Sequence, residues 1–378
     1  MPDTLLIDKA RSPSDVVAAM AAPTKADQDE RPQIISLFCG AGGMDIGFEQ
    51  AGFRIIFAAD YDLAAVETHN FNFRQNSAIQ LDLSAVSPKE FITRLRSVCP
   101  DAAPIGIVGG PPCQGFSRAN VNRSSNDPRN QLANRYADIV NALCREFPIQ
   151  FFLFENVPEI TAEKNKGFLA SLKRRLAKQF LLNCETLNAA DFGVPQTRVR
   201  FFMAGLRRHI ATGKFTFPVA GETHRTVHAT ISNLPEPVYF QRNLSADDIP
   251  NHPNHWTMRP KSARFQVPQV RAGSRSFIQL DWHRPSRTVA YGHREIHVHP
   301  RGHRRLSIYE AMLLQSFPPS YQILGNLSEQ VTQISNAVPP PVSRGLAIAL
   351  KAQLNLGEQD GDQLTAQKMK AQKDDCGS

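Results

Sequence analysis

Residues 33–45 join a short apolar run to a glycine-rich turn: Gln-Ile-Ile-Ser-Leu-Phe-Cys-Gly-Ala-Gly-Gly-Met-Asp. The apolar run predicts a buried strand. Glycines directly after a strand let the backbone turn tightly and approach a nucleotide-like ligand. A dinucleotide-binding fingerprint would carry a third glycine where Asp45 stands. The stretch therefore predicts the first strand of an α/β sheet followed by a ligand-binding loop, with a simple turn as the alternative.

From this stretch to about residue 207, apolar runs alternate with amphipathic stretches. The runs cover residues 34–38, 55–59, 105–108, 151–154, 184–187 and 201–204. Helical patterns lie near residues 62–72, 88–98, 132–146 and 167–180. Alternation of helices with continuously apolar strands predicts an α/β fold with a doubly wound, mostly parallel sheet. In such sheets, ligands gather beyond the carboxyl ends of the strands.

The remaining sequence has a different character. Residues 1–32 are polar and alanine-rich, which indicates a loosely ordered leader, and residues 356–378 form a polar tail that we expect to be disordered. Residues 208–324, here called the recognition region, are rich in Pro, Arg and His, with short extended stretches and a helical pattern at 307–315. They predict a second, smaller, irregular β-rich domain. Residues 325–355, with a helical pattern at 342–354, are expected to rejoin the first domain of residues 33–207.

Composition limits the class of protein. There is no run of eighteen apolar residues and no secretory signal, so neither a membrane span nor secretion is indicated. The six cysteines are spread singly, which suits a reducing cytoplasm. The net charge is +8, and twelve Arg or Lys residues face only four acids between residues 242 and 305. This excess predicts a polyanionic partner, which charge alone does not name, with a solvated basic face as the alternative.

Acidic residues follow two later strands. Asp60 and Tyr61 end the second apolar run, and Asp82 lies in a strand-like segment at residues 81–83. An acid at the first place can accept both ribose hydroxyls of a nucleoside, and an aromatic neighbour can cover an adenine. Asp82 is a candidate for the adenine amino group. Each acid alone is more often a helix cap or a turn residue.

Cys113 lies in the loop Gly-Gly-Pro-Pro-Cys-Gln-Gly-Phe-Ser at residues 109–117, directly after an apolar run. Two prolines make this loop stiff and place the thiol at the carboxyl edge of the sheet. A free thiol is only a few per cent ionised at neutral pH, so nucleophilic work needs a cation, a helix N-terminus or coupled proton transfer. Most lone cysteines are inert packing, but a loop between Pro-Pro and Gln-Gly is a poor place for packing.

Two further segments carry charge at strand ends. Glu155 follows a wholly apolar run, where a carboxylate is costly unless it has a task or a partner, and where burial raises its pKa. It lies 42 residues after Cys113, about one strand–helix–strand unit, so the two are expected to end neighbouring strands. In Gln-Thr-Arg-Val-Arg at 196–200, alternation puts Gln196, Arg198 and Arg200 on one face. Surface salt bridging is the alternative for these arginines.

These segments, taken in order, resemble the motifs of the cytosine-C5 DNA methyltransferases. The matching motifs are FCGAGG, GGPPCQGFS, ENV and QTRVR, followed by similar ninth and tenth motifs at residues 305–318 and 334–339. The resemblance covers about residues 34–207 and 285–350. It departs from the family at Asp60, where Glu is common, and at Ser335, where Gly is usual. Residues 215–285 match no pattern, as expected for that family's variable target-recognition region.

The resemblance implies a reaction and its residues. The fold would be Rossmann-like, the cofactor S-adenosylmethionine, and the substrate a cytosine flipped out of double-stranded DNA. Cys113 would add to C6 of the cytosine, Glu155 would bind N3 and the exocyclic amine, and Arg198 and Arg200 would fix O2. The implied cofactor residues are Phe38, Cys39, Gly40, Ala41, Gly42, Gly43, Asp60, Tyr61, Asp82, Leu83, Pro112, Asn336 and Ala337. The implied DNA contacts are Gln114, Ser117, Arg287, Thr288, Val289 and Arg294.

Some alternatives remain open at this point. A nucleotide-dependent oxidoreductase would leave the PPC, ENV and QTRVR segments without a role. The tRNA-methylating branch of the same family carries a Cys-Phe-Thr signature that this sequence lacks. The histidines clustered at residues 293–303 have no accompanying cysteines, so we expect no metal. By analogy we expect a monomer in a bacterial cytoplasm, held at the nucleoid by DNA, in a restriction–modification system whose endonuclease would act separately.

Overall fold

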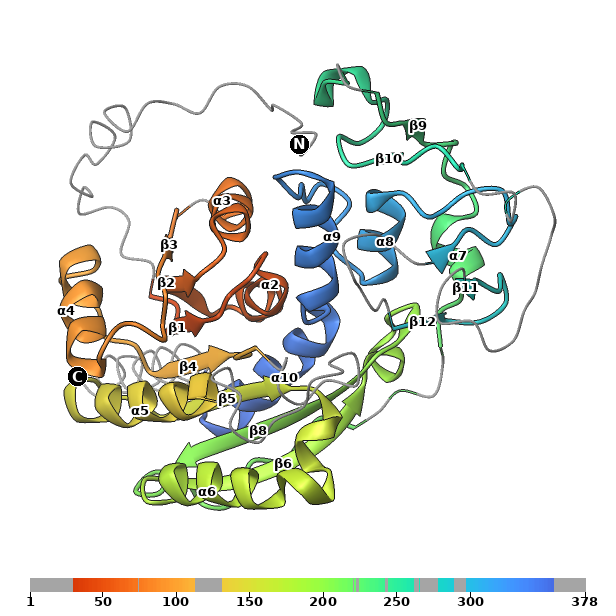
Figure 1. Cartoon of the computed structure of the whole chain (residues 1–378). Coiled ribbons are helices and arrows are strands. Elements are labelled where there is room, and N and C mark those ends of the chain that lie inside the picture. Colours follow the sequence, from red (N-terminus) through yellow and green to blue (C-terminus); the bar gives the residue numbers. More distant parts are fainter. Residues whose placement is uncertain are drawn as a thin grey trace, which may run out of the picture.

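The computed structural model describes residues 30–73, 75–112, 131–219, 221, 224–241, 244–261, 265, 278–288 and 297–356. Its centre is a seven-stranded sheet with the strand order β3-β2-β1-β4-β5-β8-β6 (Figure 1). The strands are β1 (Gln33–Leu37), β2 (Arg54–Asp60), β3 (Ala78–Gln80), β4 (Gly106–Gly109), β5 (Phe151–Asn156), β6 (Phe180–Asn188) and β8 (Val199–Arg207). β8 runs antiparallel to β5 and β6, and the other pairs are parallel. This confirms the predicted doubly wound, mostly parallel sheet.

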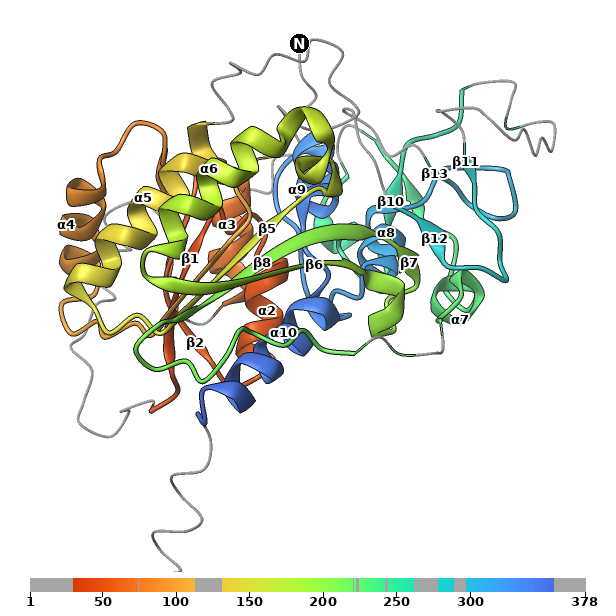
Figure 2. The same cartoon turned by 90° about the horizontal axis from the view of Figure 1, so that it is seen from below.

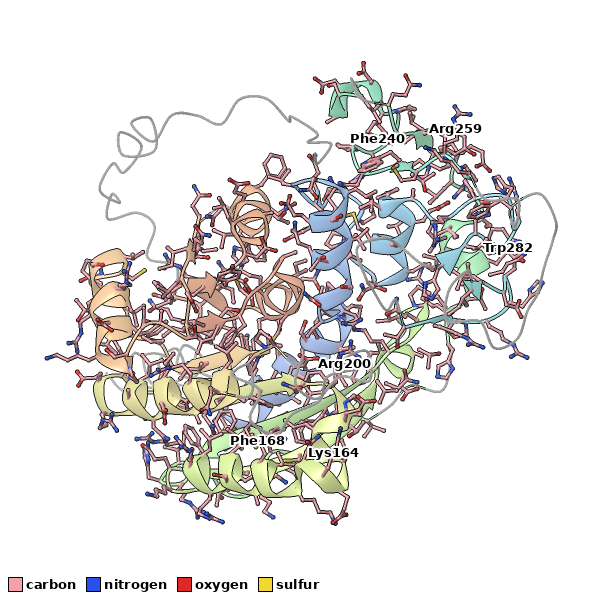
Figure 3. The ribbon with its side chains drawn as sticks, viewed as in Figure 1. Lys164, Phe168, Arg200, Phe240, Arg259 and Trp282 are labelled. Carbon is pink, nitrogen blue, oxygen red and sulfur yellow. The ribbon has the colours of Figure 1, made fainter. Side chains whose placement is uncertain are left out.

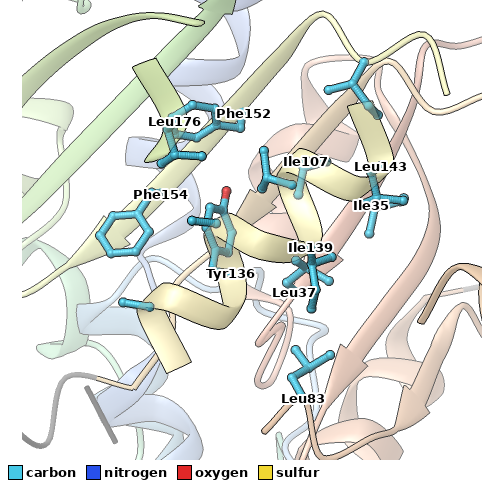
Figure 4. Close-up of a cluster of buried hydrophobic side chains, with 14 of the residues drawn as sticks. Ile35, Leu37, Leu83, Ile107, Tyr136, Ile139, Leu143, Phe152, Phe154 and Leu176 are labelled. Atoms are coloured by element: carbon cyan, nitrogen blue, oxygen red, sulfur yellow. The ribbon is translucent and has the colours of Figure 1, made fainter. Parts of the chain in front are cut away.

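Helices cover both faces of the sheet (Figure 2). One face packs against α4 (Pro88–Val98), α5 (Gln131–Glu146) and α6 (Lys166–Ala177), through the buried cluster drawn in part in Figure 4. The other face packs against α2 (Gly43–Gln50), α3 (Leu63–Asn72) and α10 (Pro340–Gln353). The strands are therefore buried on both sides, which is why they read as unbroken apolar runs.

The last helix returns to the first. α10 packs against α2 because Gly43 and Gly47 leave room for it: a Cβ on Gly43 would lie 2.5 Å from the Val338 carbonyl oxygen, and one on Gly47 would collide with the Ser343 side chain. The last stretch of the chain that the structure describes thus belongs to the same layered core as β1. This confirms the expectation that the C-terminal helix packs back against the first half of the chain.

Helix limits follow local sequence signals where those signals are strong. α4 begins and ends as predicted because Ser87 and Glu90 form a capping box and Pro88 occupies the first turn. Two predictions were incomplete. β3 ends at Gln80, so residues 81–83 follow the strand instead of forming it. α9 (Leu327–Asn336) had not been predicted, because Gln330 and Gln333 are buried on it and interrupt its apolar stripe.

The recognition region contains little regular structure. Its described elements are α7 (Val227–Ile231), β9 (Val238–Tyr239), β10 (Trp256–Thr257), β11 (Ile278–Gln279), β12 (Ser286–Arg287), β13 (His297–Val298) and α8 (Ile308–Leu314). Each strand has two residues and pairs with a single partner, and β12 pairs with β7 (Gln196–Thr197) beside the main sheet. The irregular β-rich character matches the prediction, whereas the domain limits remain a prediction. Within the described residues, no helix combines the length and apolarity that a membrane crossing requires.

Candidate active site

The glycine loop, residues 38–43, leaves β1 in an unusual backbone conformation. Phe38, Gly40 and Gly42 have φ values of 57°, 53° and 75°. Glycine adopts this region freely, but at Phe38 it is strained by about 1–3 kcal/mol, so neighbouring groups must hold it. The Gly40 N–H donates to Oδ2 of Asp60 at 2.8 Å, and the Cys39 N–H donates to the Ala59 carbonyl at 3.1 Å. β2 therefore fixes the loop through one carboxylate and one carbonyl.

The predicted acids lie at the carboxyl ends of β2 and β3, which are neighbours. Asp60 ends β2, and its second oxygen accepts the Asp62 N–H at 2.9 Å. Burial raises the pKa of Asp60, while the two backbone N–H groups oppose that rise. Tyr61 is 72% exposed beside it. Asp82 follows β3 on the surface, and hydrogen bonds from Ser84 lower its pKa.

The other predicted cofactor residues divide by exposure. The side chains of Cys39, Ala41, Leu83 and Ala337 are buried in the apolar clusters, so these residues can offer a ligand mainly their backbone. Burial raises the pKa of the Cys39 thiol, which keeps it neutral. Pro112 and Asn336 are exposed. A Cβ added to Gly40 would meet no heavy atom within 4 Å, so space is open above that residue.

The segment leading to Cys113 runs beside Glu155. β4 and β5 are parallel neighbours, with Gly109 opposite Phe154. A Cβ on Gly110 would lie 2.7 Å from Oε2 of Glu155, so only glycine allows this approach. Asn156 donates from Nδ2 to the Pro111 carbonyl at 3.1 Å. The expectation that the Cys113 loop and Glu155 end neighbouring strands is thus confirmed for the residues before Cys113.

Glu155 and Arg200 form an ion pair. Nε of Arg200 lies 3.2 Å from Oε1 of Glu155, and their side chains are 16% and 10% exposed. Burial raises the pKa of the Glu155 carboxyl, and Arg200 and Arg198 oppose that rise. Arg200 is the second residue of β8, and its side chain is labelled in Figure 3. With its raised pKa, the Glu155 carboxyl group can carry a proton, and it can then donate a hydrogen bond to a ring nitrogen of a ligand.

Arg198 points into the protein. Its side chain is 1% exposed, and Nη2 donates to the Ser335 carbonyl of α9 at 2.6 Å. Its backbone N–H donates to Oδ1 of Asn188 at 3.1 Å. Gln196 is also buried and Arg200 partly so, whereas Thr197 and Val199 between them are exposed. The predicted alternation is confirmed, and Arg198 connects β8 to the segment of the tenth motif.

One predicted DNA-contact segment reaches this site. β12 pairs in parallel with β7, with Arg287 opposite Thr197. Oγ1 of Thr288 donates to the Thr197 carbonyl at 2.7 Å, and Arg287 is exposed. Residues far apart in the sequence are thereby joined next to Arg198. The predicted Cys113, Gln114, Ser117, Val289 and Arg294 lie outside the described residues.

One of the arginines counted between residues 242 and 305 is buried, so not all of that positive charge is available to a polyanionic partner. Arg304 is 1% exposed, and its guanidinium donates to both oxygens of Glu310, at 2.8 and 2.9 Å, and to Glu236 at 2.6 Å. His297 and His299 are also buried, and burial lowers the pKa of each to about 4. These three side chains are buried within the recognition region, so they are not available to contact phosphates. No group of three or more potential metal ligands occurs in the parts of the chain that the structure describes.

Sequence reasoning gave no role to Asn156, Asn188 or Tyr321. Asn156 holds the Pro111 carbonyl, Asn188 holds the Arg198 N–H, and the Tyr321 hydroxyl donates to the Ala41 carbonyl at 2.5 Å. Asn156 belongs to the ENV motif, so that motif was a signal for it. Tyr321 lies 280 residues from its partner, and no local pattern indicates the contact.

Comparison with known proteins gives the family. The family model for C-5 cytosine-specific DNA methylases matches residues 32–352. The Type II methyltransferase M.NmeDI of Neisseria meningitidis serogroup C is 30% identical over 356 residues, covering 85% of this chain and 84% of that protein. M.MthTI of Methanothermobacter thermautotrophicus, also a Type II methyltransferase, is 32% identical over 349 residues, covering 85% and 97%.

Solved structures agree on the fold. A structure described as a DNA modification methyltransferase encoded within an E. coli prophage has a TM-score of 0.66 at 24% identity, covering 86% of this chain and 99% of that one. The Dnmt2 methyltransferase of S. pombe has a TM-score of 0.58 at 16% identity, with the same coverage. The family match spans the sheet, the glycine loop and the Glu155–Arg200 pair. The chain belongs to the C-5 cytosine-specific DNA methylase family and is a DNA cytosine-5 methyltransferase.

Proposed function

We propose that this chain transfers a methyl group from S-adenosylmethionine to C5 of a cytosine within a specific double-stranded DNA sequence. The observation that carries this proposal is the Glu155–Arg200 pair, which lies against Gly110 at the edge of the sheet where the glycine loop also ends. A carboxyl group with a raised pKa and a nearby loop carrying a cysteine suit addition to an electron-poor pyrimidine.

The residues present suit the cofactor. Open space above Gly40 lets a ligand approach the backbone of the glycine loop there. Asp60 would accept the ribose hydroxyls, Tyr61 would cover the adenine, and Asp82 would approach its amino group. The remaining contacts would come from Phe38, Gly42, Gly43, Leu83, Pro112 and Asn336. S-adenosylmethionine supplies an activated methyl group there.

The chain's own residues would carry the covalent steps. The Cys113 thiolate adds to C6 of cytosine. The electrons of the C5–C6 double bond then shift toward C5, which becomes nucleophilic. Glu155 donates a hydrogen bond or proton to N3, which stabilises the negative charge as it forms. Arg200 holds Glu155 in place and would bind the O2 atom, and the buried Arg198, bonded to the Ser335 carbonyl, would hold the segment that carries Arg200. C5 would take the methyl group, leaving the cofactor as the neutral thioether S-adenosylhomocysteine. A water molecule would then take the C5 proton, the C5–C6 double bond would form again, and the thiolate would leave C6.

The reaction requires an exposed base. Cytosine within stacked DNA cannot reach Cys113, so it must flip out, at a cost of a few kcal/mol. Thr288, bonded to the Thr197 carbonyl beside Arg198, would support the flipped nucleotide together with Val289. The recognition region would read the surrounding sequence, with Gln114, Ser117, Arg287 and Arg294 near the DNA. The relatives are Type II methyltransferases, which supports a restriction–modification role with a separate endonuclease.

Methyl transfer from labelled S-adenosylmethionine tests the proposal. The purified protein should label double-stranded DNA and leave tRNA unlabelled. Bisulfite sequencing of DNA from cells that express it should show protected cytosines in one short sequence. Exchanging residues 215–285 for those of a relative should move the protected sequence. Labelling of tRNA alone, or methylation at adenine, would refute the proposal.

A further inference from the structure

Residues 321–324 are far from the glycine loop in sequence but contact it through Tyr321. The hydroxyl of Tyr321 donates to the Ala41 carbonyl at 2.5 Å, and both groups are buried. The same hydroxyl would be 3.1 Å from a Cβ added to Gly42. Burial raises the pKa of Tyr321 well above its usual value, so its oxygen keeps its proton and remains a donor. Tyr321 therefore contacts the loop at the residue between its two left-handed glycines.

Side chains on both sides hold the main chain around Tyr321. Asn72 of α3 forms two hydrogen bonds with the backbone of Gln322, at 2.7 and 3.0 Å. Asn254 forms two with the backbone of Ile323, at 2.8 and 2.9 Å. The two asparagine amides thus pair with the backbone N–H and carbonyl groups of this segment, as the backbone of a neighbouring strand would. The residue that follows them on this segment is held in the same way, since Thr68 accepts the Leu324 N–H at 2.9 Å.

His252, which also belongs to the recognition region, forms a further hydrogen bond with the main chain of Tyr321. Nε2 of His252 lies 3.0 Å from the Tyr321 carbonyl, and the His252 ring stacks on Tyr309 at 4.0 Å. Burial lowers the pKa of His252 to about 4, so its ring is neutral near pH 7. A neutral ring that accepts the Asn254 N–H at Nδ1 must donate from Nε2, which matches the contact to the carbonyl. The main chain of Tyr321 is thus fixed by His252, and its hydroxyl is fixed on the Ala41 carbonyl of the glycine loop.

We propose that Tyr321 is a positioning residue for cofactor binding, which holds the glycine loop in its left-handed conformation through the Ala41 carbonyl. The proposal rests on the function proposed above, because it assumes that the loop binds S-adenosylmethionine. Phe38 is strained, and the bonds from Asp60 and Ala59 hold only the N–H groups of residues 39 and 40. Tyr321 holds the loop one residue later, at a carbonyl group instead of an N–H group.

The test is Tyr321→Phe in the full chain, which removes one oxygen and keeps the ring. The dissociation constant for S-adenosylmethionine, measured by calorimetry without DNA, should rise about tenfold. The Michaelis constant for the cofactor should rise with it, while kcat at saturating cofactor stays within about twofold. A residue with a structural role alone would lower the melting temperature and the active fraction without this split between the two constants.

Tyr309→Phe is the matched control. It removes the same atom from a neighbouring tyrosine whose ring stacks on His252 and whose hydroxyl makes no hydrogen bond to the glycine loop. Its affinity for the cofactor should equal that of the wild type. Asn72→Ala, which loosens the backbone of Gln322, should weaken cofactor binding less than Tyr321→Phe does.

The outcomes separate the two proposals. If the wild type binds no S-adenosylmethionine, the proposed function fails, whatever the variants do. If the wild type binds and Tyr321→Phe binds equally well, the role of Tyr321 is wrong and the proposed function stands. Should Tyr321→Phe fold poorly, the Asn72→Ala result decides, since unchanged cofactor affinity there also contradicts the proposal.

Discussion

The edge formed by β1, β2 and β3 and the recognition region are stabilised in different ways. At the edge, parallel strands of three to seven residues and covering helices place Gly40 and Asp60, and the clusters buried under the strands are apolar. In the recognition region the described strands have two residues each, and buried polar side chains such as Arg304 and Asn254 provide much of the order. A regular scaffold tolerates the loss of one hydrogen bond better than a network of buried polar groups does.

Removing a buried charge from the recognition region should have the largest effect. Arg304→Ala leaves Glu310 buried without its bidentate partner, and such a loss costs about 3–5 kcal/mol of the free energy of unfolding. Arg301→Ala is the control, because Arg301 is exposed and also pairs with Glu236; it should change stability by less than about 0.5 kcal/mol. Chemical denaturation measures both, and equal effects would contradict the difference between the regions.

Glu155→Gln should affect the reaction and leave the scaffold intact. The amide keeps the shape of the side chain but cannot donate a proton to N3, so kcat should fall by about 10²–10³. Cofactor affinity and melting temperature should stay near wild type, because the amide oxygen of glutamine can still accept the Arg200 Nε–H and Glu155 is not one of the proposed cofactor residues. Activity near that of the wild type would exclude Glu155 as the group that binds N3.

Acid should destabilise the recognition region through its buried histidines. Burial lowers the pKa of His252, His297 and His299 to about 4, from an ordinary value near 6.5. Between these values the unfolded chain binds protons and the folded chain does not. Stability is therefore complete above about pH 6.5 and falls as the pH drops toward 4, by on the order of 1–3 kcal/mol for each histidine. Denaturation at several pH values, with His299→Gln expected to reduce the slope, measures this.

Asp60→Asn should have the smallest effect of the four. The amide can still accept the Gly40 N–H but binds ribose hydroxyls less well, so the dissociation constant for S-adenosylmethionine should rise about tenfold. Asp62→Asn is the control, since Asp62 caps α3 and only its backbone N–H contacts Asp60. A similar loss of affinity in both variants would indicate a local change in the loop.

The same contrast explains what could be predicted from the sequence. Strands buried on both faces and the capped helix at residues 88–98 were recognisable because local composition determines them. The spacing of Cys113 and Glu155 located one edge of the site. The Arg304–Glu236 pair, the Asn254 contacts and the hydrogen bond from Tyr321 to Ala41 join distant residues through single side chains. No periodicity in the sequence encodes such contacts.

The central claim is that Cys113 attacks a flipped cytosine next to Glu155, and covalent trapping tests it most directly. Double-stranded DNA with 5-fluorocytosine at the target position cannot lose the group at C5, so an enzyme bonded to C6 stays attached. With S-adenosylmethionine present, the wild type should form a complex with this DNA that survives denaturing electrophoresis, and peptide mapping should locate the bond at Cys113. Cys113→Ser should form none. A wild type that releases this DNA unchanged, or a Cys113→Ser variant that is trapped equally well, would contradict the account.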